Sequence, residues 1–277
     1  MALLSEKEVL NLKLNSIPLS QLKELASYLG ISYRGTAADI IKKIIKEKPN
    51  QKSIDEFIKR KYQEKIENRR KIISDEDLKK ELMKVKTFSW GVVQGQLDQK
   101  IQTNYVRKFF RYEDLLNHIK LKLYKEITNY VICTWFNHWT TVLIEEYVNT
   151  HPKVVPTLKN IKGIDFFFYN QPFDLKVTYL PRGYDPIKAI ENPYDLIIWL
   201  YENQGAQRFG ADNRLFIVLL DKNNPEKSWE LKRDFDFVFQ KIYEFFNKET
   251  ISEKDEIIFT FKKKTYSTIA KILLIVK

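Results

Sequence analysis

The stretch GIDFFFYNQPFDLKVT, residues 163–178, contains two β-forming segments separated by residues that favour a turn. Ile164 to Phe168 and Phe173 to Tyr179 predict two strands, and Asn170 to Pro172 between them predicts the turn of a hairpin. Because alternate residues of a strand share a face, one face is wholly apolar: Ile164, Phe166, Phe168, Phe173, Leu175 and Val177. The opposite face carries Asp165, Phe167, Asp174, Lys176 and Thr178.

The register of this hairpin follows from burying both apolar sets. We expect Phe168 to face Phe173, a pairing that sets Asp165 directly across from Lys176. Carboxylates are hard oxygen ligands suited to Mg²⁺, and divalent ions can activate water and neutralise charge in phosphodiester hydrolysis. A lysine beside them can offset charge on the phosphate. The alternative is a surface ion pair between the lysine and one acid, worth about 1 kcal/mol at most.

An acid followed about ten residues later by Asp-X-Lys on a hairpin resembles the signature of the PD-(D/E)XK nuclease superfamily, to which many restriction endonucleases belong. In this resemblance Asp165 is the first acid, and Asp174 and Lys176 complete the motif. Ile164 stands where the superfamily has its nominal proline. The resemblance implies that Asp165, Asp174 and Lys176 are catalytic. It also implies a metal site for Mg²⁺, with Mn²⁺ as a substitute, that includes both acids and Leu175.

A long aromatic-rich helix is predicted from about Tyr112 to Tyr147, upstream of the hairpin. Its apolar residues recur at intervals of three and four and should form one buried stripe: Ile132, Trp135, Phe136, Trp139, Leu143 and Tyr147. Glu146 falls within this stripe, where a carboxylate is costly unless it is paired or binds a cation. The superfamily often adds a glutamate from a preceding helix. We therefore assign Glu146 to the catalytic and metal-binding residues, with Glu145 as the alternative.

The residues after the hairpin predict alternating helices and strands. Asn192-Pro193 begins a helix that runs through Tyr201, and Leu215 to Leu220 is a continuous apolar run typical of a buried strand. An amphipathic helix from about Trp229 to Phe246 and a strand-rich C-terminal tail follow. We expect an α/β fold: a restriction-endonuclease-like core over residues 88–277, in which helices flank a central mixed β-sheet.

The N-terminal part predicts a small all-α helix-loop-helix domain. Leucines recur at helical spacing up to Gly30, which ends a first helix, and Thr36 can cap a second. This pattern resembles the SAP-type DNA-binding module, although a generic helical hairpin is the alternative. We assign residues 1–50 to it, with Lys42 and Lys43 as contacts to DNA, and the charged residues 51–87 to a helical linker.

Composition limits the partners. The formal net charge of +11 and pI near 9.3 favour a polyanion such as DNA, but also fit an ordinary basic protein. The single cysteine excludes a disulfide framework and a cysteine-rich zinc site. No Walker-type phosphate loop is present. Since no apolar run approaches the roughly 18 residues of a bilayer span, we expect a cytoplasmic protein with no membrane partner.

A glycine- and amide-rich loop before the strand at Leu215 offers further DNA contacts, because Arg and Gln suit guanine and adenine edges. Ordinary capping and solvation explain the loop equally well. The residues assigned to DNA here are Gln207, Arg208, Asn213 and Arg214.

These features predict a Mg²⁺-dependent endonuclease for double-stranded DNA, in the first place a sequence-specific type II restriction endonuclease. The alternatives are a structure-specific nuclease of repair, recombination or phage defence, and a non-catalytic DNA-binding protein on a nuclease fold. A double-strand break needs two cuts, so we expect a homodimer. Its interface would come from the helix at 129–147 or from the C-terminal segment.

Overall fold

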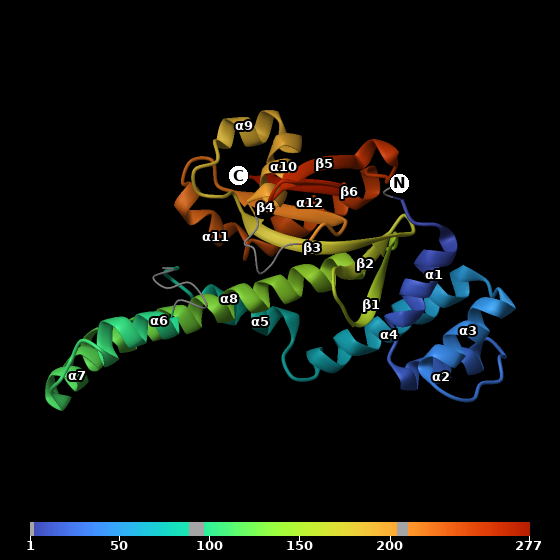
Figure 1. Cartoon of the computed structure of the whole chain (residues 1–277), viewed down its shortest axis with the longest axis horizontal. Coiled ribbons are helices and arrows are strands. Elements are labelled where there is room, and N and C mark those ends of the chain that lie inside the picture. The colour runs from blue at the N-terminus through green and yellow to red at the C-terminus, as the bar shows by residue number, and fades with distance from the viewer. Residues whose placement is uncertain (1–2, 89–96, 204–209) are drawn as a thin grey trace. The chain divides into compact units, whose positions relative to one another are not determined.

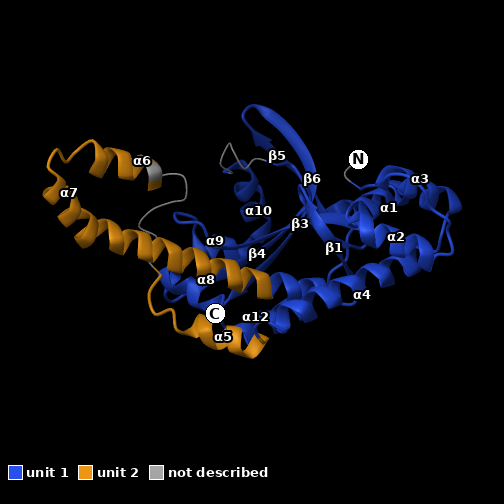
Figure 2. Ribbon diagram, turned by 90° about the horizontal axis from the view of Figure 1, so that it is seen from below, with its two compact units in different colours: residues 1–73, 144–277 blue, residues 74–143 orange. Residues whose placement is uncertain are grey.

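The computed structural model describes residues 3–88, 97–203 and 210–277 (Figure 1). The chain divides into two compact units, residues 1–73 with 144–277 and residues 74–143 (Figure 2). Among the helices of these described ranges, none combines the length and apolar character that a membrane span requires.

The first unit contains a mixed β-sheet, and its described residues supply six strands in the order β1-β2-β3-β4-β6-β5. The pairs β3–β4 and β4–β6 are parallel, and the other neighbours are antiparallel. The strands are β1 (Val154–Ile161), β2 (Ile164–Phe168), β3 (Gln171–Tyr179), β4 (Arg214–Leu220), β5 (Glu256–Phe261) and β6 (Lys264–Val276).

Helices cover both faces of this sheet because β4 is apolar on both sides. Leu215 and Ile217 pack in one core with the end of α8 (Tyr124–Asn149) and with α12 (Phe235–Lys248). Phe216 and Val218, which point the other way, pack with α9 (Pro186–Glu191) and α10 (Pro193–Glu202). The short helices η4 (Pro225–Lys227), α11 (Ser228–Leu231) and η5 (Glu253–Asp255) lie in the connections. An α/β fold with a mixed sheet flanked by helices is therefore confirmed.

The hairpin is confirmed, but its turn lies earlier than predicted. Tyr169 and Asn170 have φ values of 47° and 56°, and two such residues in succession are typical of a type I′ turn, whose twist matches that of the strands. Pro172, which we expected in the turn, lies inside β3.

This turn sets a register that differs by two residues from the predicted one. Phe166 is opposite Phe173, and one further step in this register puts Asp165 opposite Asp174. The prediction that Asp165 faces Lys176 is therefore wrong. Because the difference is an even number of residues, Asp165, Asp174 and Lys176 stay on one face of the hairpin. Ile164, which we predicted on the apolar face with Phe166, packs instead in the same core as Phe167.

The two predicted N-terminal helices are confirmed as α2 (Leu19–Tyr28) and α3 (Ala37–Glu47), preceded by α1 (Glu6–Asn15). Gly30 follows α2 with φ of 69°, and the Thr36 side chain caps α3 in a reciprocal capping box with Asp39. These helices share one core with Val155 and Phe167 of the hairpin region. Whether residues 1–50 act as a separate DNA-binding domain stays a prediction.

The predicted linker is helical, but α4 (Gln51–Arg70) is more than a solvated connector. It buries Ile54, Phe57 and Ile58 in the core of the N-terminal helices and contacts β1. This packing explains why Phe167 occurs on the charged face of the hairpin: N-terminal helices cover that part of the face.

The second unit contains α5 (Asp75–Met83), α6 (Leu97–Ile101), η1 (Gln102–Val106), α7 (Tyr112–His118), η2 (Ile119–Leu123) and the greater part of α8. The predicted long helix is thus confirmed as α7, η2 and α8 in direct succession, but its buried stripe agrees with the prediction only at Phe136 and Leu143. Ile132 and Trp135 are exposed, and the buried residues of α8 are Cys133, Phe136, Thr140, Leu143, Ile144, Val148 and Asn149.

The shared N-terminal core leads to a prediction about stability. Leu14→Ala removes a fully buried side chain from that core and should lower the free energy of unfolding by about 2–5 kcal/mol. Leu19→Ala, at an exposed position of the neighbouring helix, should change it by less than about 0.5 kcal/mol. Urea unfolding followed by circular dichroism measures both. Equal losses of unfolding free energy in the two variants would contradict the shared core.

Candidate active site

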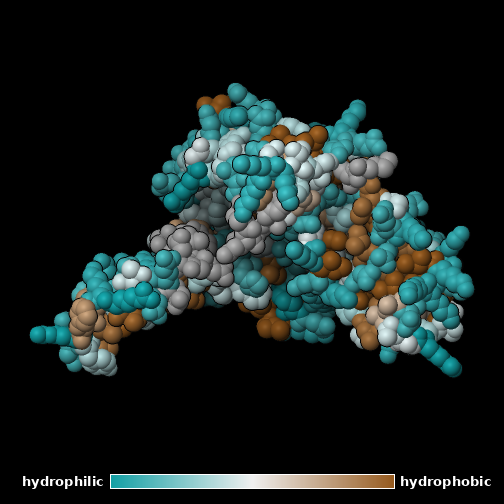
Figure 3. All heavy atoms as spheres, in the orientation of Figure 1, coloured by the Kyte–Doolittle hydropathy of each residue, from teal (hydrophilic) through white to brown (hydrophobic). Residues whose placement is uncertain are grey.

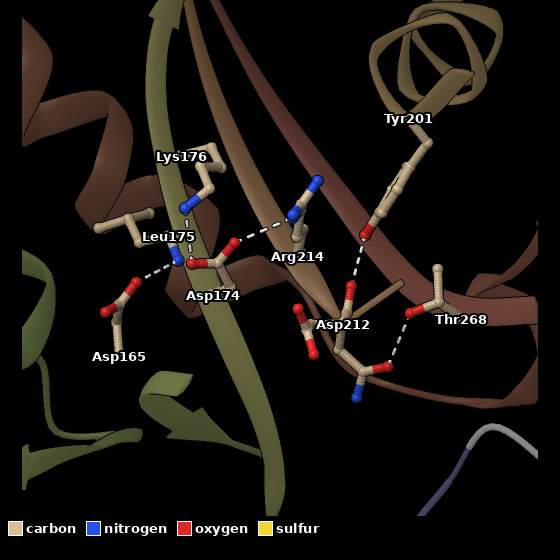
Figure 4. Close-up of polar contacts among 9 residues, drawn as sticks. Asp165, Asp174, Leu175, Lys176, Tyr201, Asp212, Arg214 and Thr268 are labelled. Carbon is tan, nitrogen blue, oxygen red and sulfur yellow. Dashed lines mark hydrogen bonds and ion pairs between the residues drawn. The ribbon is translucent and has the colours of Figure 1, made fainter. Parts of the chain in front are cut away.

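Two carboxylates lie opposite one another where the ladder between β2 and β3 ends. The last pair of that ladder is Phe166 with Phe173. Beyond it, the N–H of Leu175 donates to Oδ2 of Asp165 at 2.7 Å, so a side chain takes the place of a backbone acceptor (Figure 4). Asp165 is thereby held against β3, next to Asp174. The structure brings these two predicted acids together.

Asp174 is anchored by two cations. Its Oδ1 accepts from Lys176 Nζ at 2.7 Å and its Oδ2 from Arg214 Nε at 2.9 Å (Figure 4). Asp174 and Arg214 are partners in the parallel register of β3 and β4, so their side chains leave the sheet on the same face. The Asp174 side chain is only 10% exposed, which separates this site from the surface ion pair considered as the alternative.

Lys176 differs from Arg214 in its freedom to move. Its side chain is 47% exposed, whereas that of Arg214 is 6% exposed and lies over the ring of Tyr201, whose centroid is 5.0 Å from the guanidinium carbon. Arg214 therefore fixes the acid, and Lys176 can turn toward solvent or a ligand.

The surroundings of Asp165 raise the pKa of its carboxyl group above the ordinary value. Burial raises its pKa, the N–H of Leu175 lowers it, and the neighbouring charge of Asp174 raises it again, with a net rise. A carboxyl group in this situation gains from a nearby cation, because the cation relieves both the burial and the repulsion.

The structure places Glu145, and not Glu146, beside Asp165. Glu146 forms an ion pair with Arg69 of α4. Glu145 lines a cavity of about 130 Å³ next to Asp165, together with Tyr62, Lys65, Asn149, Thr157, Leu158, Lys159 and Asn160. Our choice of Glu146 for the site is corrected accordingly: its carboxylate is used by Arg69, and the buried stripe of α8 is displaced from the predicted one.

Glu145 and Lys232 form a second acid and base near the site, and sequence reasoning missed the lysine. Burial, and then the charge of Asp165, raise the pKa of Glu145 to about 7. Burial lowers the pKa of Lys232 to about 7 against the opposing effect of Glu145. Lys232 is 3% exposed and follows α11, where the sequence resembles an ordinary charged helix end. No local pattern distinguishes it.

The predicted DNA-binding residues fall into three groups. Gln207 and Arg208 lie outside the described residues. Asn213 and Arg214 are used internally. The Oδ1 of Asn213 accepts from the Thr268 hydroxyl and from the Ile269 N–H, each at 3.0 Å, and Arg214 is buried against Asp174 (Figure 4). These contacts do not favour a role for either in binding DNA.

Lys42 and Lys43 lie on α3, more than a hundred residues before Asp165 and Asp174 in the sequence. Lys42 is exposed, and Lys43 donates to the Ser32 hydroxyl at 2.8 Å. Their contact with DNA stays a prediction.

Over residues 3–88, 97–203 and 210–277, no three His, Cys, Asp or Glu side chains form a ready-made metal cluster. Asp165 and Asp174 are adjacent, and Glu145 joins Asp165 across the cavity. The arrangement is a pair of acids with a third at one side.

The raised pKa of Glu145 predicts a dependence of stability on pH. The folded chain holds this proton up to about pH 7, while the unfolded chain releases it near the ordinary value, so stability falls as pH rises through that window. Glu145→Gln removes the effect: its advantage over wild type in free energy of unfolding should grow from pH 5 to pH 7. Glu146→Gln, which removes the partner of Arg69, should destabilise the chain. If the difference in free energy of unfolding between Glu145→Gln and wild type stayed constant from pH 5 to pH 7, the raised pKa of a buried Glu145 would be contradicted.

Comparison of the chain with protein-family models, with curated proteins and with solved structures gave no match. The geometry around Asp165 and Asp174 therefore carries the functional argument.

Proposed function

We propose that this chain is a divalent-metal-dependent endonuclease that hydrolyses phosphodiester bonds of double-stranded DNA. One observation carries the proposal: Asp165 and Asp174 lie opposite one another at the end of the β2–β3 ladder, with Lys176 in contact with the second acid. Two acids and a half-exposed lysine on one sheet face suit phosphoryl chemistry better than stability, since adjacent like charges are unfavourable.

The oxygen atoms at this site suit Mg²⁺, with Mn²⁺ as a substitute. The N–H of Asp174 donates to the carbonyl of Asn213, the residue before β4, so the N–H and C=O of Leu175 point to the opposite edge of β3. The N–H of Leu175 does donate to Asp165 there. The Leu175 carbonyl shares that edge, which supports Asp165, Asp174 and Leu175 as the metal-binding set. A bound metal would activate water and neutralise phosphate charge.

The chain's own residues have separable roles in this proposal. The Leu175 N–H holds Asp165 in place, and Arg214 holds Asp174. Lys176, freed from Asp174 by rotation of its exposed side chain, offsets charge on the scissile phosphate. Glu145, whose pKa of about 7 lies near neutrality, suits acceptance of a proton from water in the adjoining cavity.

Within this class we favour a sequence-specific type II restriction endonuclease that works as a homodimer. One pair of acids per chain supplies one cut, and a two-fold axis that matches the DNA supplies the second. The net charge of +11 suits the phosphate backbone of such a substrate.

Cleavage of plasmid DNA in Mg²⁺, with EDTA as a blank, tests the site. Asp165→Asn and Lys176→Ala should each reduce the rate by at least about 10²-fold, because each removes a charged group next to the scissile phosphate. The control pair Asp195→Asn and Lys188→Ala, from an exposed ion pair in the same unit, should cut like wild type. Cleavage by Asp165→Asn at the control rate would reject the assignment.

Metal binding has a readout besides activity. Mg²⁺ should raise the melting temperature of the wild type, and more so at pH 8 than at pH 5, because protons compete with the metal for an Asp165 of raised pKa. Asp165→Asn should lose this stabilisation, and Asp195→Asn should keep it. An equal rise in all three proteins, measured by calorimetry, would show that Mg²⁺ binds elsewhere.

A further inference from the structure

The loop from Arg107 to Arg111, between η1 and α7, presents an aromatic side chain among cations. Phe110 is 97% exposed, and Arg107, Lys108 and Arg111 are exposed around it. Figure 2 shows α7 at the turn of the second unit, where the chain passes from α6 to α8. Burial within the unit does not account for this ring.

The loop is held in place by its neighbours. The N–H of Arg107 donates to the Gln102 carbonyl at 2.9 Å, and the N–H of Phe109 to the Tyr105 carbonyl at 3.2 Å. The Phe109 ring also packs on His118, with 4.2 Å between the ring centroids. Because Phe109 and these backbone hydrogen bonds anchor the loop, its backbone presents Phe110 to solvent.

The surrounding surface is basic. Between residues 106 and 125, two acids, Glu113 and Asp114, stand against six exposed basic residues, Arg107, Lys108, Arg111, Lys120, Lys122 and Lys125. Among the described residues, no ion pair involves any of these six. Elsewhere in the same unit, Lys80 and Lys84 pair with acids. Figure 3 shows hydrophobic residues surrounded by hydrophilic ones at the α7 end of the unit.

We propose that the loop 107–111 is a second DNA-binding element, separate from the acid site. Its cations contact backbone phosphates, and Phe110 inserts between base pairs from the minor groove, as apolar wedges do in proteins that bend DNA. The choice of DNA as the polyanion rests on the proposed function. The element would then position or bend the duplex without contributing to chemistry.

Two other occupants fit the loop less well. A two-fold contact between copies, centred on this loop, would bring Arg107, Lys108 and Arg111 close to the same cations of the partner, which like charges oppose. An anionic membrane would attract the cations, but one inserted ring supplies too little apolar area for stable anchoring. Duplex DNA uses both the charge and the single ring.

Binding of a fluorescent duplex in EDTA, where no cleavage occurs, tests the cations. Arg107→Ala combined with Arg111→Ala should lower the slope of log affinity against log salt by about 2, since each phosphate contact contributes about 0.9. Lys80→Ala combined with Lys84→Ala removes the same charge from the same unit but from paired positions. This control should keep the wild-type slope. Equal slopes in all three proteins would overturn the proposal.

Phe110 is tested with an unstacking-sensitive fluorescent base in the duplex. Phe110→Ala should abolish the fluorescence increase, weaken binding by about tenfold and leave the salt slope unchanged, while Phe110→Trp should retain the signal. Ile72→Ala, at another exposed apolar position, should behave like wild type. Loss of vesicle binding, or dissociation of a dimer, in Phe110→Ala without any change in DNA binding would overturn the proposal in favour of a lipid surface or a second copy.

The outcomes separate this inference from the proposed nuclease activity. A wild type that cuts DNA in Mg²⁺, with loop variants that bind and unstack DNA normally, rejects the loop alone. A wild type that binds and unstacks DNA through Phe110 but never cuts it rejects the nuclease and leaves the loop standing.

Discussion

The ion pair between Asp174 and Arg214 ties the candidate site to the sheet. The two residues are register partners on neighbouring parallel strands, and both are buried. A buried charge that loses its partner is strongly destabilising, so neither side chain can move far while the sheet stays intact. One oxygen of the acid is thereby fixed, and the other faces Lys176. The position of the chemistry thus depends on the pairing of two strands rather than on a loop.

The hairpin that carries Asp165 is held from both sides. Phe166 and Phe173 pack in the core formed with α8 and α12, whereas Phe167 packs among the N-terminal helices. The acid lies between residues that belong to two different cores. Its alignment with β3 therefore requires both helical layers, and the N-terminal helices contribute to it whether or not they bind DNA.

Local patterns in the sequence predicted much of the fold and less of the site. Alternation identified β2 and the faces of β3, and Thr36 marked the start of α3, because these signals are contained in a few adjacent residues. The sequence did not reveal the surroundings of Glu145 and Arg214, because these come from distant segments: Asp165 and Lys232 for the first, Asp174 and Tyr201 for the second. β1 was missed, since Pro156 and the polar residues after it hide the strand.

The two-residue turn at Tyr169 and Asn170 makes this region intolerant of changes in length. Most surface loops absorb an inserted or deleted residue at little cost. Here the turn joins strands whose side chains alternate between two faces, so a change of one residue would rotate Asp174 into the apolar core and bring an apolar neighbour to the site. Among homologues of this chain, we expect the length of this turn to stay constant even where its two residues, Tyr169 and Asn170, are substituted.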